Sequence, residues 1–145
     1  MISIITGSYN RLNNIKRLIS NTVDANQLLE LVIVDGGSTD GTVEYMQNLN
    51  HKNIKFINYG KRSTYPHFSN LAIESSKFDF ICQWDDDALL INEWDDVLEL
   101  VNTNIYDFFT LKMVTNIGVF RKKAPKSIKP DINTDFYVFF PLKLK

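Results

Sequence analysis

The sequence predicts an α/β fold, in which a mainly parallel sheet is flanked by helices on both faces. Short apolar runs rich in β-branched residues alternate along the chain with segments whose apolar residues recur at helical spacing. Such alternation is typical of parallel sheets with helical crossovers. The chain has 145 residues, of which 44% are hydrophobic, enough for one domain with its own core. We therefore expect a single domain over residues 1–145.

Two strand–helix units are expected at the start of the chain. Strands are predicted over residues 2–6 and 29–34, because both runs are apolar and β-branched. Asn10 is expected to cap the first helix, and Ser38 or Thr39 the second, since short polar side chains accept hydrogen bonds from free helical amides. The buried helical positions would be Leu12, Ile15, Ile19 and Val23, then Val43, Met46 and Leu49.

The middle of the chain repeats this pattern, and the end departs from it. A third strand is predicted over residues 54–59, a helix with Pro66 in its first turn, and a fourth strand over residues 78–84. A helix capped by Asn92 would bury Trp94, Val97, Leu98 and Val101. Further strands are expected over residues 106–115, 117–121 and 136–140, separated by proline-containing loops.

The charges nearly cancel but are unevenly distributed. The net charge is −1, which excludes a chain-wide basic field for nucleic acid. Residues 79–107 hold nine acidic side chains and no Lys or Arg, whereas residues 108–145 hold eight basic and two acidic ones. The first segment can bind a cation and the second can face an anion. The alternative is that both are solvated faces.

Composition also narrows the class of protein. A single cysteine, Cys82, excludes an internal disulfide framework and a cysteine-rich zinc site. No apolar run approaches the roughly 20 residues of a transmembrane helix, and the N-terminus lacks the basic region of a signal peptide. We therefore expect a cytoplasmic protein without a transmembrane segment.

Polar residues follow three of the predicted strands, at positions 7–11, 35–41 and 85–87. Ligands of parallel α/β sheets bind in the crevice beyond the carboxyl ends of the strands. Because these ends meet at one edge, the fold itself would bring the three stretches together.

The acidic triplet Asp85–Asp87 is a candidate metal site. In an extended backbone Asp85 and Asp87 project to the same side, so both can share one cation. Oxygen ligands without nearby His or Cys favour Mg²⁺ or Mn²⁺, and such an ion usually completes its shell with substrate phosphates. The alternative is an ordinary acidic loop after a strand.

The two other stretches suit a planar or phosphorylated ligand. Asp35 can accept hydrogen bonds from a base or ribose, and Gly37 and Ser38 offer close backbone approach beside unpaired helical amides. Tyr9 can stack on a base. The alternatives are a turn with a helix cap and a turn with a half-buried aromatic ring.

Three segments together resemble the family 2 glycosyltransferases of the GT-A fold: "SIITGSYNR", "LVIVDGGSTDGT" and "SNLAIESSKFDFICQWDDDA". The resemblance implies metal-dependent transfer of a sugar, with inversion, from a nucleoside-diphosphate sugar to an acceptor hydroxyl, and a UDP-sugar is the expected donor. It implies a nucleotide-sugar-binding part over residues 1–107 and a reduced acceptor-side part over residues 108–145. The implied donor-binding residues are Gly7, Tyr9, Asn10, Asp35, Gly37, Ser38, Arg62, Asn70, Asp85 and Asp86.

By the same resemblance, Asp87 would be the main metal contact with Asp85 in support, and Asp86 would lie near the ribose. Lys61, Arg62 or His67 could add to the stabilisation of charge on the leaving diphosphate. The family's catalytic base lies in a downstream acidic motif that this sequence matches only loosely. Asp135 is the candidate base, with Asp131 as the other choice.

Two other functions stay open at this stage. One is a binding module that keeps the nucleotide-sugar pocket but transfers nothing. The other is a sugar nucleotidyltransferase, which the absence of a Gly-x-Gly-x-Arg loop after the first strand disfavours. The sequence identifies neither the sugar nor the acceptor, which can be a glycan, a lipid-linked molecule or a protein, and it leaves a homo-oligomer open.

Overall fold

A computed structural model of the chain describes residues 1–88, 94–102, 114–115 and 118–119. Its centre is a parallel sheet with the strand order β3-β2-β1-β4. The strands are β1 (Ile2–Ser8), β2 (Leu29–Asp35), β3 (Ile54–Asn58) and β4 (Ile81–Gln83). The predicted α/β architecture is therefore confirmed.

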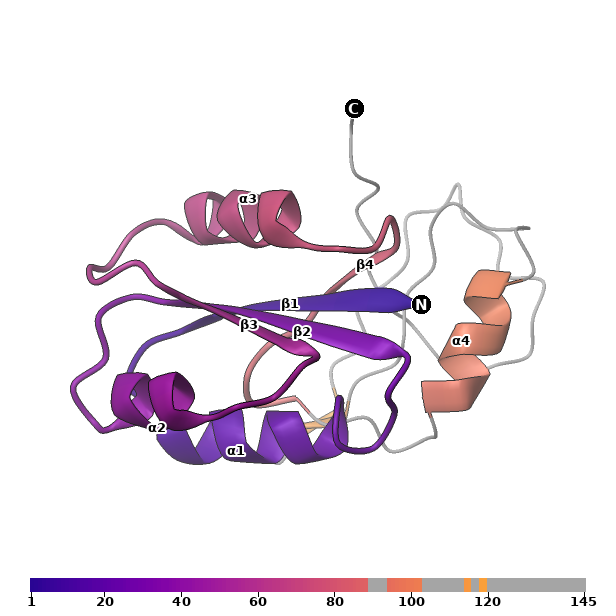
Figure 1. Cartoon of the computed structure of the whole chain (residues 1–145), viewed down its shortest axis with the longest axis horizontal. Helices are drawn as coiled ribbons and strands as arrows, with labels where there is room; N and C mark the ends of the chain where they lie inside the picture. Colours follow the sequence, from indigo (N-terminus) through magenta and orange to yellow (C-terminus); the bar gives the residue numbers. More distant parts are fainter. Residues whose placement is uncertain (89–93, 103–113, 116–117, 120–145) are drawn as a thin grey trace.

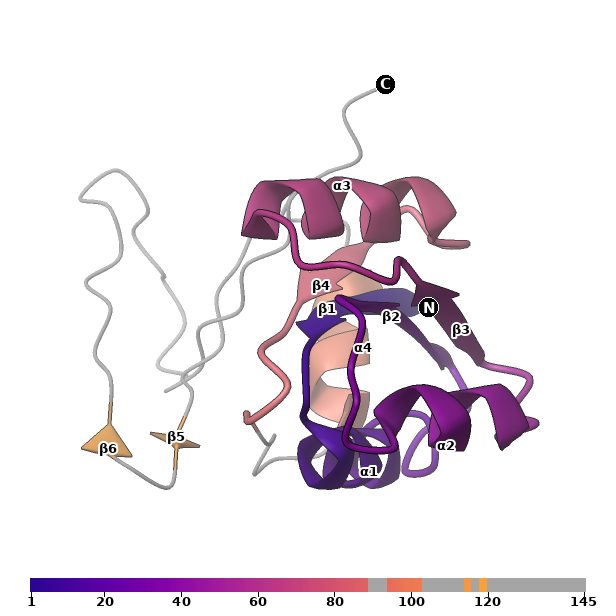
Figure 2. The same cartoon turned by 90° about the vertical axis from the view of Figure 1, so that its left-hand side faces the viewer.

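Helices cover both faces of this sheet, as predicted. Figures 1 and 2 show α3 (Tyr65–Ser75) on one face, and α1 (Leu12–Asn21) and α2 (Thr42–Asn48) on the other. The helix α4 (Trp94–Asn102) packs into the same core as α1. The short strands β5 (Val114–Thr115) and β6 (Gly118–Val119) form an antiparallel pair. The strand predicted over residues 136–140 lies outside the described residues.

The core consists of two apolar layers, because side chains of each strand alternate between the faces of the sheet. Ile5, Val32 and Val34 lie against α3, in the layer that contains Ala72. The opposite layer joins α1, α2 and α4, and its rings of Trp84 and Trp94 lie 5.4 Å apart. Both tryptophans and Cys82 are buried, as the sequence predicted.

The caps predicted for the first two helices are wrong, because one aspartate serves both helix starts, and the predicted cap Asn92 lies outside the described residues. The Asp40 carboxylate accepts the Leu12 amide at 3.0 Å and the Thr42 amide at 3.1 Å. Asn10, with φ 54°, lies before the first helix, and its side-chain oxygen accepts the Thr39 amide instead. Neither Ser38 nor Thr39 caps α2, which begins after Gly41.

The fourth strand is shorter than predicted, since side chains replace the sheet ladder before Ile81. The Glu30 carboxylate accepts the Ser3 hydroxyl at 2.5 Å and the Lys77 amide at 2.7 Å. The Ser3 hydroxyl in turn accepts the Phe78 amide at 3.1 Å. These bonds fix the chain between α3 and β4 without extending the strand to residue 78.

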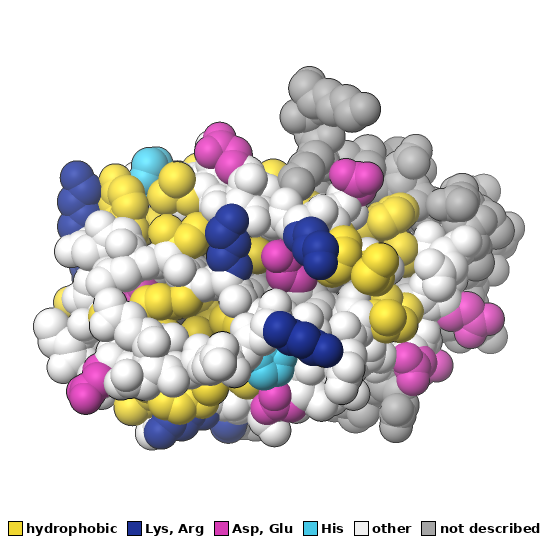
Figure 3. All heavy atoms as spheres, in the orientation of Figure 1, with side chains coloured by type: hydrophobic (Ala, Val, Ile, Leu, Met, Phe, Trp, Pro, Cys, Tyr) yellow, Lys and Arg dark blue, Asp and Glu magenta, His cyan; other side chains and the backbone are white. Residues whose placement is uncertain are grey.

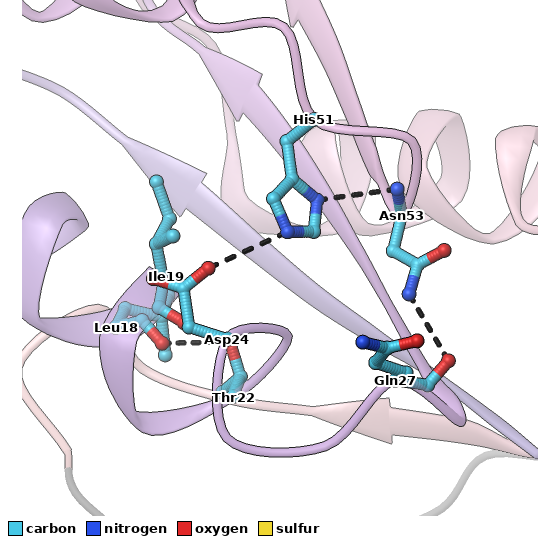
Figure 4. Close-up of polar contacts among 7 residues, drawn as sticks. All are labelled: Leu18, Ile19, Thr22, Asp24, Gln27, His51 and Asn53. Atoms are coloured by element: carbon cyan, nitrogen blue, oxygen red, sulfur yellow. Dashed lines mark hydrogen bonds and ion pairs between the residues drawn. The ribbon is translucent and has the colours of Figure 1, made fainter.

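A separate polar network holds the amino ends of β2 and β3 (Figure 4). The His51 ring lies 3.4 Å from the Asp24 carboxylate and accepts the Asn53 amide at 3.2 Å. The Asn53 side chain donates to the carbonyl of Gln27. His51 therefore supports the fold at the end of the sheet opposite to the carboxyl ends of its strands.

The mixture of charges on the surface and the character of the helices are consistent with the net charge of −1 and the lack of long apolar runs in the sequence. On the face drawn in Figure 3, Lys and Arg side chains are interspersed with acidic and hydrophobic ones. Within the part of the chain that the structure describes, no helix has the length and apolar character needed to cross a membrane.

Candidate functional site

The carboxyl ends of the strands bring the polar stretches together, as predicted. In the sheet register Ser8 lies opposite Asp35, and Asp35 lies opposite Asn58. The ladder extends past the strands, because Gly36 donates to the Ser8 carbonyl and Trp84 donates to the Ile5 carbonyl. Figure 2 shows the molecule from this end of the sheet. The loops after β1, β2 and β4 therefore share one edge.

Asp35 organises the loop that follows β2. Its Oδ1 atom accepts the amides of Gly37 at 2.9 Å and Ser38 at 2.7 Å, and its Oδ2 atom accepts the Ser38 hydroxyl at 2.6 Å. The side chain is fully buried. A carboxylate has about four acceptor positions, and these bonds occupy three of them.

The loops after β1 and β2 are joined to each other. The Asn10 amide donates to the Ser38 hydroxyl at 2.8 Å, while the Asn10 side chain accepts the Thr39 amide at 2.7 Å. Although partial burial raises it, the hydrogen bonds from Thr42 and Leu12 hold the pKa of Asp40 below its ordinary value. The carboxylate that joins α1 to α2 is therefore ionised at neutral pH.

Glycines let α3 and the loop before it approach this edge. A Cβ atom on Gly7 or Gly36 would lie 3.4 or 3.3 Å from the Phe68 ring, so both glycines make room for this ring. Gly37 has φ +86°, and a Cβ atom there would lie 2.7 Å from the Gly60 carbonyl oxygen. The loops after β2 and β3 are therefore in close backbone contact.

The loop after β3 carries positive charge over the edge. The Arg62 guanidinium lies 4.6 Å from the centre of the Tyr9 ring, which is 38% exposed. Lys61 lies over the Tyr59 ring at 5.5 Å, and the His67 and Phe68 rings lie 4.9 and 5.8 Å from that ring, measured between ring centres. The His67 Nε2 atom is buried and has no hydrogen-bond partner within the described residues. Arg62 and Tyr9, both predicted site residues, are thus brought into contact.

The acidic triplet forms a turn directly after β4. The Ala88 amide donates to the Asp85 carbonyl at 3.1 Å, and the Trp84 indole donates to the Ala88 carbonyl at 2.9 Å. Because Trp84 is buried in the core, the turn is fixed at its base. Asp85 and Asp87 are exposed.

Asp86 differs from its neighbours, because it lies against α1. Burial, and then the negative charges of Asp87 and Asp85, raise the pKa of Asp86, while the charge of Arg11 and a hydrogen bond with Asn14 oppose the rise. Asp86 therefore ties the acidic turn to the first turn of α1.

The donor set of this turn fits a hard cation held by few protein ligands. The exposed groups are carboxylates, and among the described residues no three His, Cys, Asp or Glu side chains converge into a complete metal site. An ion on two carboxylates keeps coordination positions for phosphate oxygens and water, which is the usual arrangement for Mg²⁺.

The remaining predicted site residues are Asn70 and the two candidate bases, Asp135 and Asp131. Asn70 lies exposed on α3. The candidate base Asp135, and Asp131 with it, lie outside the described residues.

Sequence reasoning missed several residues at this edge. Asn14 lies one turn into α1, so its spacing from Arg11 places both near the start of the helix. Tyr65, at the first position of α3, is hydrogen-bonded by the Gln83 side chain at the end of β4. Helix-start and strand-end positions on a parallel sheet face the ligand edge. This rule could have identified Arg11, Asn14, Tyr65 and Gln83.

Comparison with protein families gives a match over nearly the whole chain. Residues 3–142 match the model described as Glycosyl transferase family 2. No curated protein sequence matches the chain.

Several solved structures resemble this chain in their fold. S. aureus TarS 1–349 in complex with UDP has a TM-score of 0.68 at 23% identity, over 83% of this chain and 38% of that one. The mannosyltransferase PcManGT from Pyrobaculum calidifontis, in complex with GDP-Man and Mn²⁺, has a TM-score of 0.61 at 22% identity, over 75% of this chain and 33% of that one.

Glucosyl-3-phosphoglycerate synthase from Mycobacterium tuberculosis, in complex with Mn²⁺, UDP and glucosyl-3-phosphoglycerate, has a TM-score of 0.55 at 18% identity. The match covers 77% of this chain and 42% of that one. The present chain thus spans well under half the length of each of these three proteins. At these identities the structural likeness shows the fold, which is GT-A.

Proposed function

The chain belongs to glycosyl transferase family 2, and from this premise we propose that its described part binds a nucleoside-diphosphate sugar at the carboxyl edge of the sheet. The sugar would be transferred to an acceptor hydroxyl with inversion. The observation that carries the proposal is the convergence of the loops after β1, β2 and β4 on that edge. A UDP-sugar is the first donor to test, since TarS has been crystallised with UDP and with UDP-GlcNAc.

The nucleotide would lie over the loops after β1 and β2. Tyr9 is the proposed stacking partner of the base, because its ring is exposed at this edge. Asp35 fixes the loop beneath and has one acceptor position left for the base. The further residues proposed to line the donor site are Gly7, Asn10, Gly37, Ser38, Asn70 and Asp86.

The diphosphate would lie between Arg62 and the acidic turn. Arg62 donates planar, paired hydrogen bonds that match phosphate oxygens, and its loop already lies over Tyr9. Negative charge grows on the leaving diphosphate as the glycosidic bond breaks, so a fixed cation at this position lowers the barrier. Lys61 lies on the same loop as Arg62, and His67 lies in the first turn of α3, which follows that loop. Both side chains can add to the electrostatic stabilisation of the diphosphate.

Asp85 and Asp87 are the proposed ligands of a divalent cation, Mn²⁺ or Mg²⁺. When bound, the ion supplies Lewis-acid stabilisation of the leaving diphosphate. PcManGT and glucosyl-3-phosphoglycerate synthase were both crystallised with Mn²⁺. The two carboxylates hold the ion on the protein, and the Asp86 tie to α1 keeps their turn in place.

Inverting transfer also needs a base on the face of the sugar opposite to the diphosphate. Asp135 is the proposed base, which would remove the proton of the acceptor hydroxyl as that oxygen attacks the sugar. The acceptor class, whether glycan, lipid-linked molecule or protein, is set by the part of the site that faces the sugar.

The test compares Asp87→Asn with Asp79→Asn, a matched change at an exposed carboxylate before β4. UDP binding is measured by calorimetry with and without Mn²⁺, and sugar release from UDP-sugars is measured with candidate acceptors. We expect Asp87→Asn to lose the Mn²⁺-dependent part of binding and all transfer, while Asp79→Asn behaves like the wild type. Unchanged activity of Asp87→Asn would refute the proposed role of the turn.

That experiment, together with an assay for pyrophosphate release, separates the competing functions. Tight UDP-sugar binding without transfer or hydrolysis would indicate a binding module. Release of pyrophosphate from a nucleoside triphosphate and a sugar phosphate would indicate a nucleotidyltransferase.

A further inference from the structure

Gln83 lies two positions before the acidic turn, and its side chain is held by helix α3. Gln83, the last residue of β4, donates a hydrogen bond from its side-chain amide to the Tyr65 hydroxyl. Tyr65 is the first residue of α3, and the Ser69 side chain, one helical turn later, also hydrogen-bonds with it. This contact connects α3 to the strand end from which the acidic turn leaves.

The hydrogen bond to Gln83 places the Tyr65 hydroxyl at the end of β4, two positions before the acidic turn begins. Burial, and then the negative charge of Asp85, raise the pKa of Tyr65, while hydrogen bonds with Gln83 and Ser69 oppose the rise. The ring is 48% exposed, so the residue contributes less to the core than a buried tyrosine would.

The end of β4 depends on such a contact more than the other strand ends do. The strand has three residues, and within the described chain it pairs with β1 alone. The loop after β2 is fixed by several hydrogen bonds from its own backbone to Asp35, whereas the acidic turn is held by the Ala88–Asp85 backbone bond, by the Trp84 indole at its base and by side-chain contacts with other elements, such as that of Asp86 with α1. Because Trp84 fixes the base of the turn, the Tyr65–Gln83 contact acts on the residue directly before that base and can adjust the orientation of the turn.

We propose that Tyr65 is a positioning residue, which holds Gln83 and through it orients the Asp85–Asp87 turn toward a divalent cation and the diphosphate. This inference rests on the proposed function of that turn. Replacing Tyr65 by Phe removes one oxygen atom and leaves every carboxylate of the turn intact. The loss should therefore appear in metal-dependent binding and not in the contacts made by the nucleotide base.

The test uses Tyr65→Phe, with Tyr45→Phe on α2 as the matched control, because Tyr45 lies on the other face of the sheet. We expect UDP affinity in the presence of Mn²⁺ to fall about five- to tenfold in Tyr65→Phe, the usual effect of one lost hydrogen bond. UDP affinity without metal should stay within about twofold of the wild-type value. Tyr45→Phe should leave both affinities unchanged.

Hydrogen exchange provides the second measurement. The peptide containing residues 84–88 should exchange faster in Tyr65→Phe, because the Ala88 amide is bonded within the turn. Exchange in β1 and β2 should not change. Gln83→Leu should reproduce both effects, and the double variant should be no worse than either single one, since the two side chains act through one contact.

Three results would overturn the inference. If Tyr65→Phe binds Mn²⁺ and UDP like the wild type, the proposed function stands and the positioning role is wrong. If affinity with and without metal falls together and exchange rises throughout the sheet, Tyr65 supports only the fold. If the wild type binds no UDP under either condition, the proposed function fails and this inference fails with it.

Discussion

The close contact between Gly37 and Gly60 permits a sharp test of how the candidate site is built. Gly37 combines a positive φ of +86° with a Cβ position 2.7 Å from the Gly60 carbonyl oxygen and 2.8 Å from the carbonyl carbon. Gly41 has a similar φ of +92°, but the nearest atom to its Cβ position is Leu12 Cδ2 at 3.6 Å. The two sites therefore share the backbone strain and differ in the clash.

The magnitudes follow from these two terms. A non-glycine residue in the left-handed region costs about 1–2 kcal/mol, so Gly41→Ala should lower the free energy of unfolding by that amount. Gly37→Ala adds a collision with backbone atoms, which cannot rotate away, and overpacking of this kind costs about 1–3 kcal/mol more. We expect a total of about 3 kcal/mol for Gly37→Ala.

Urea unfolding followed by circular dichroism measures both variants, and equal slopes would show that the unfolded states are comparable. Gly37→Ala should also weaken UDP binding, because the displaced loop carries Arg62 over Tyr9. Gly41→Ala should leave UDP binding unchanged. If Gly37→Ala were no more destabilising than Gly41→Ala, the close approach of the two loops would be incorrect.

Three further predictions concern the fold around the site. Glu30→Ala should destabilise the protein by about 2–3 kcal/mol in urea unfolding, because a buried hydroxyl and a backbone amide lose their acceptor, whereas exposed Glu74→Ala should stay within about 0.5 kcal/mol. Asp40 has a lowered pKa in the folded protein. The difference in the free energy of unfolding between wild type and Asp40→Asn should therefore be present near neutral pH, and it should vanish as the pH falls below 3.8 and through that lowered pKa. A constant difference down to strong acid would contradict this. Complete burial raises the pKa of the Cys82 thiol, so a thiol reagent followed by absorbance should react with unfolded protein only, and rapid modification of the folded chain would contradict the burial.

The sheet could be predicted because its strands are buried on both faces. Such strands are nearly continuous apolar runs, which local sequence reveals, and the parallel topology then places their carboxyl ends at one edge. The apolar runs and the parallel topology are therefore sufficient to place Tyr9, Asp35 and the acidic triplet at the same edge.

The errors arose where distant residues decide local structure. Asp40 caps the start of α1 across 28 positions of sequence, so no nearby residue marks Leu12 as the first helical position. Glu30 binds the Lys77 amide across 47 positions and thereby shortens the fourth strand. Hydrogen bonds of this kind have no periodic signature in the sequence. For the same reason the specific contacts of Tyr65 with Gln83 and of Asp86 with α1 could not be anticipated, although the rule on strand ends and helix starts could have placed these residues at the edge.

The loops of the site differ in how they are held, and this difference has a functional consequence. The loop after β2 satisfies its own amides through Asp35 and is fixed to its neighbours by Asn10 and Gly37. Preformed sites of this kind bind with little ordering cost, so the nucleotide part should bind UDP without metal. The acidic turn instead depends on side chains outside it, from α1 and α3. Substitutions at those outside contacts should therefore change the affinity for metal while the affinity for the nucleotide alone stays the same, which would make donor recognition and diphosphate activation separable properties of this small domain.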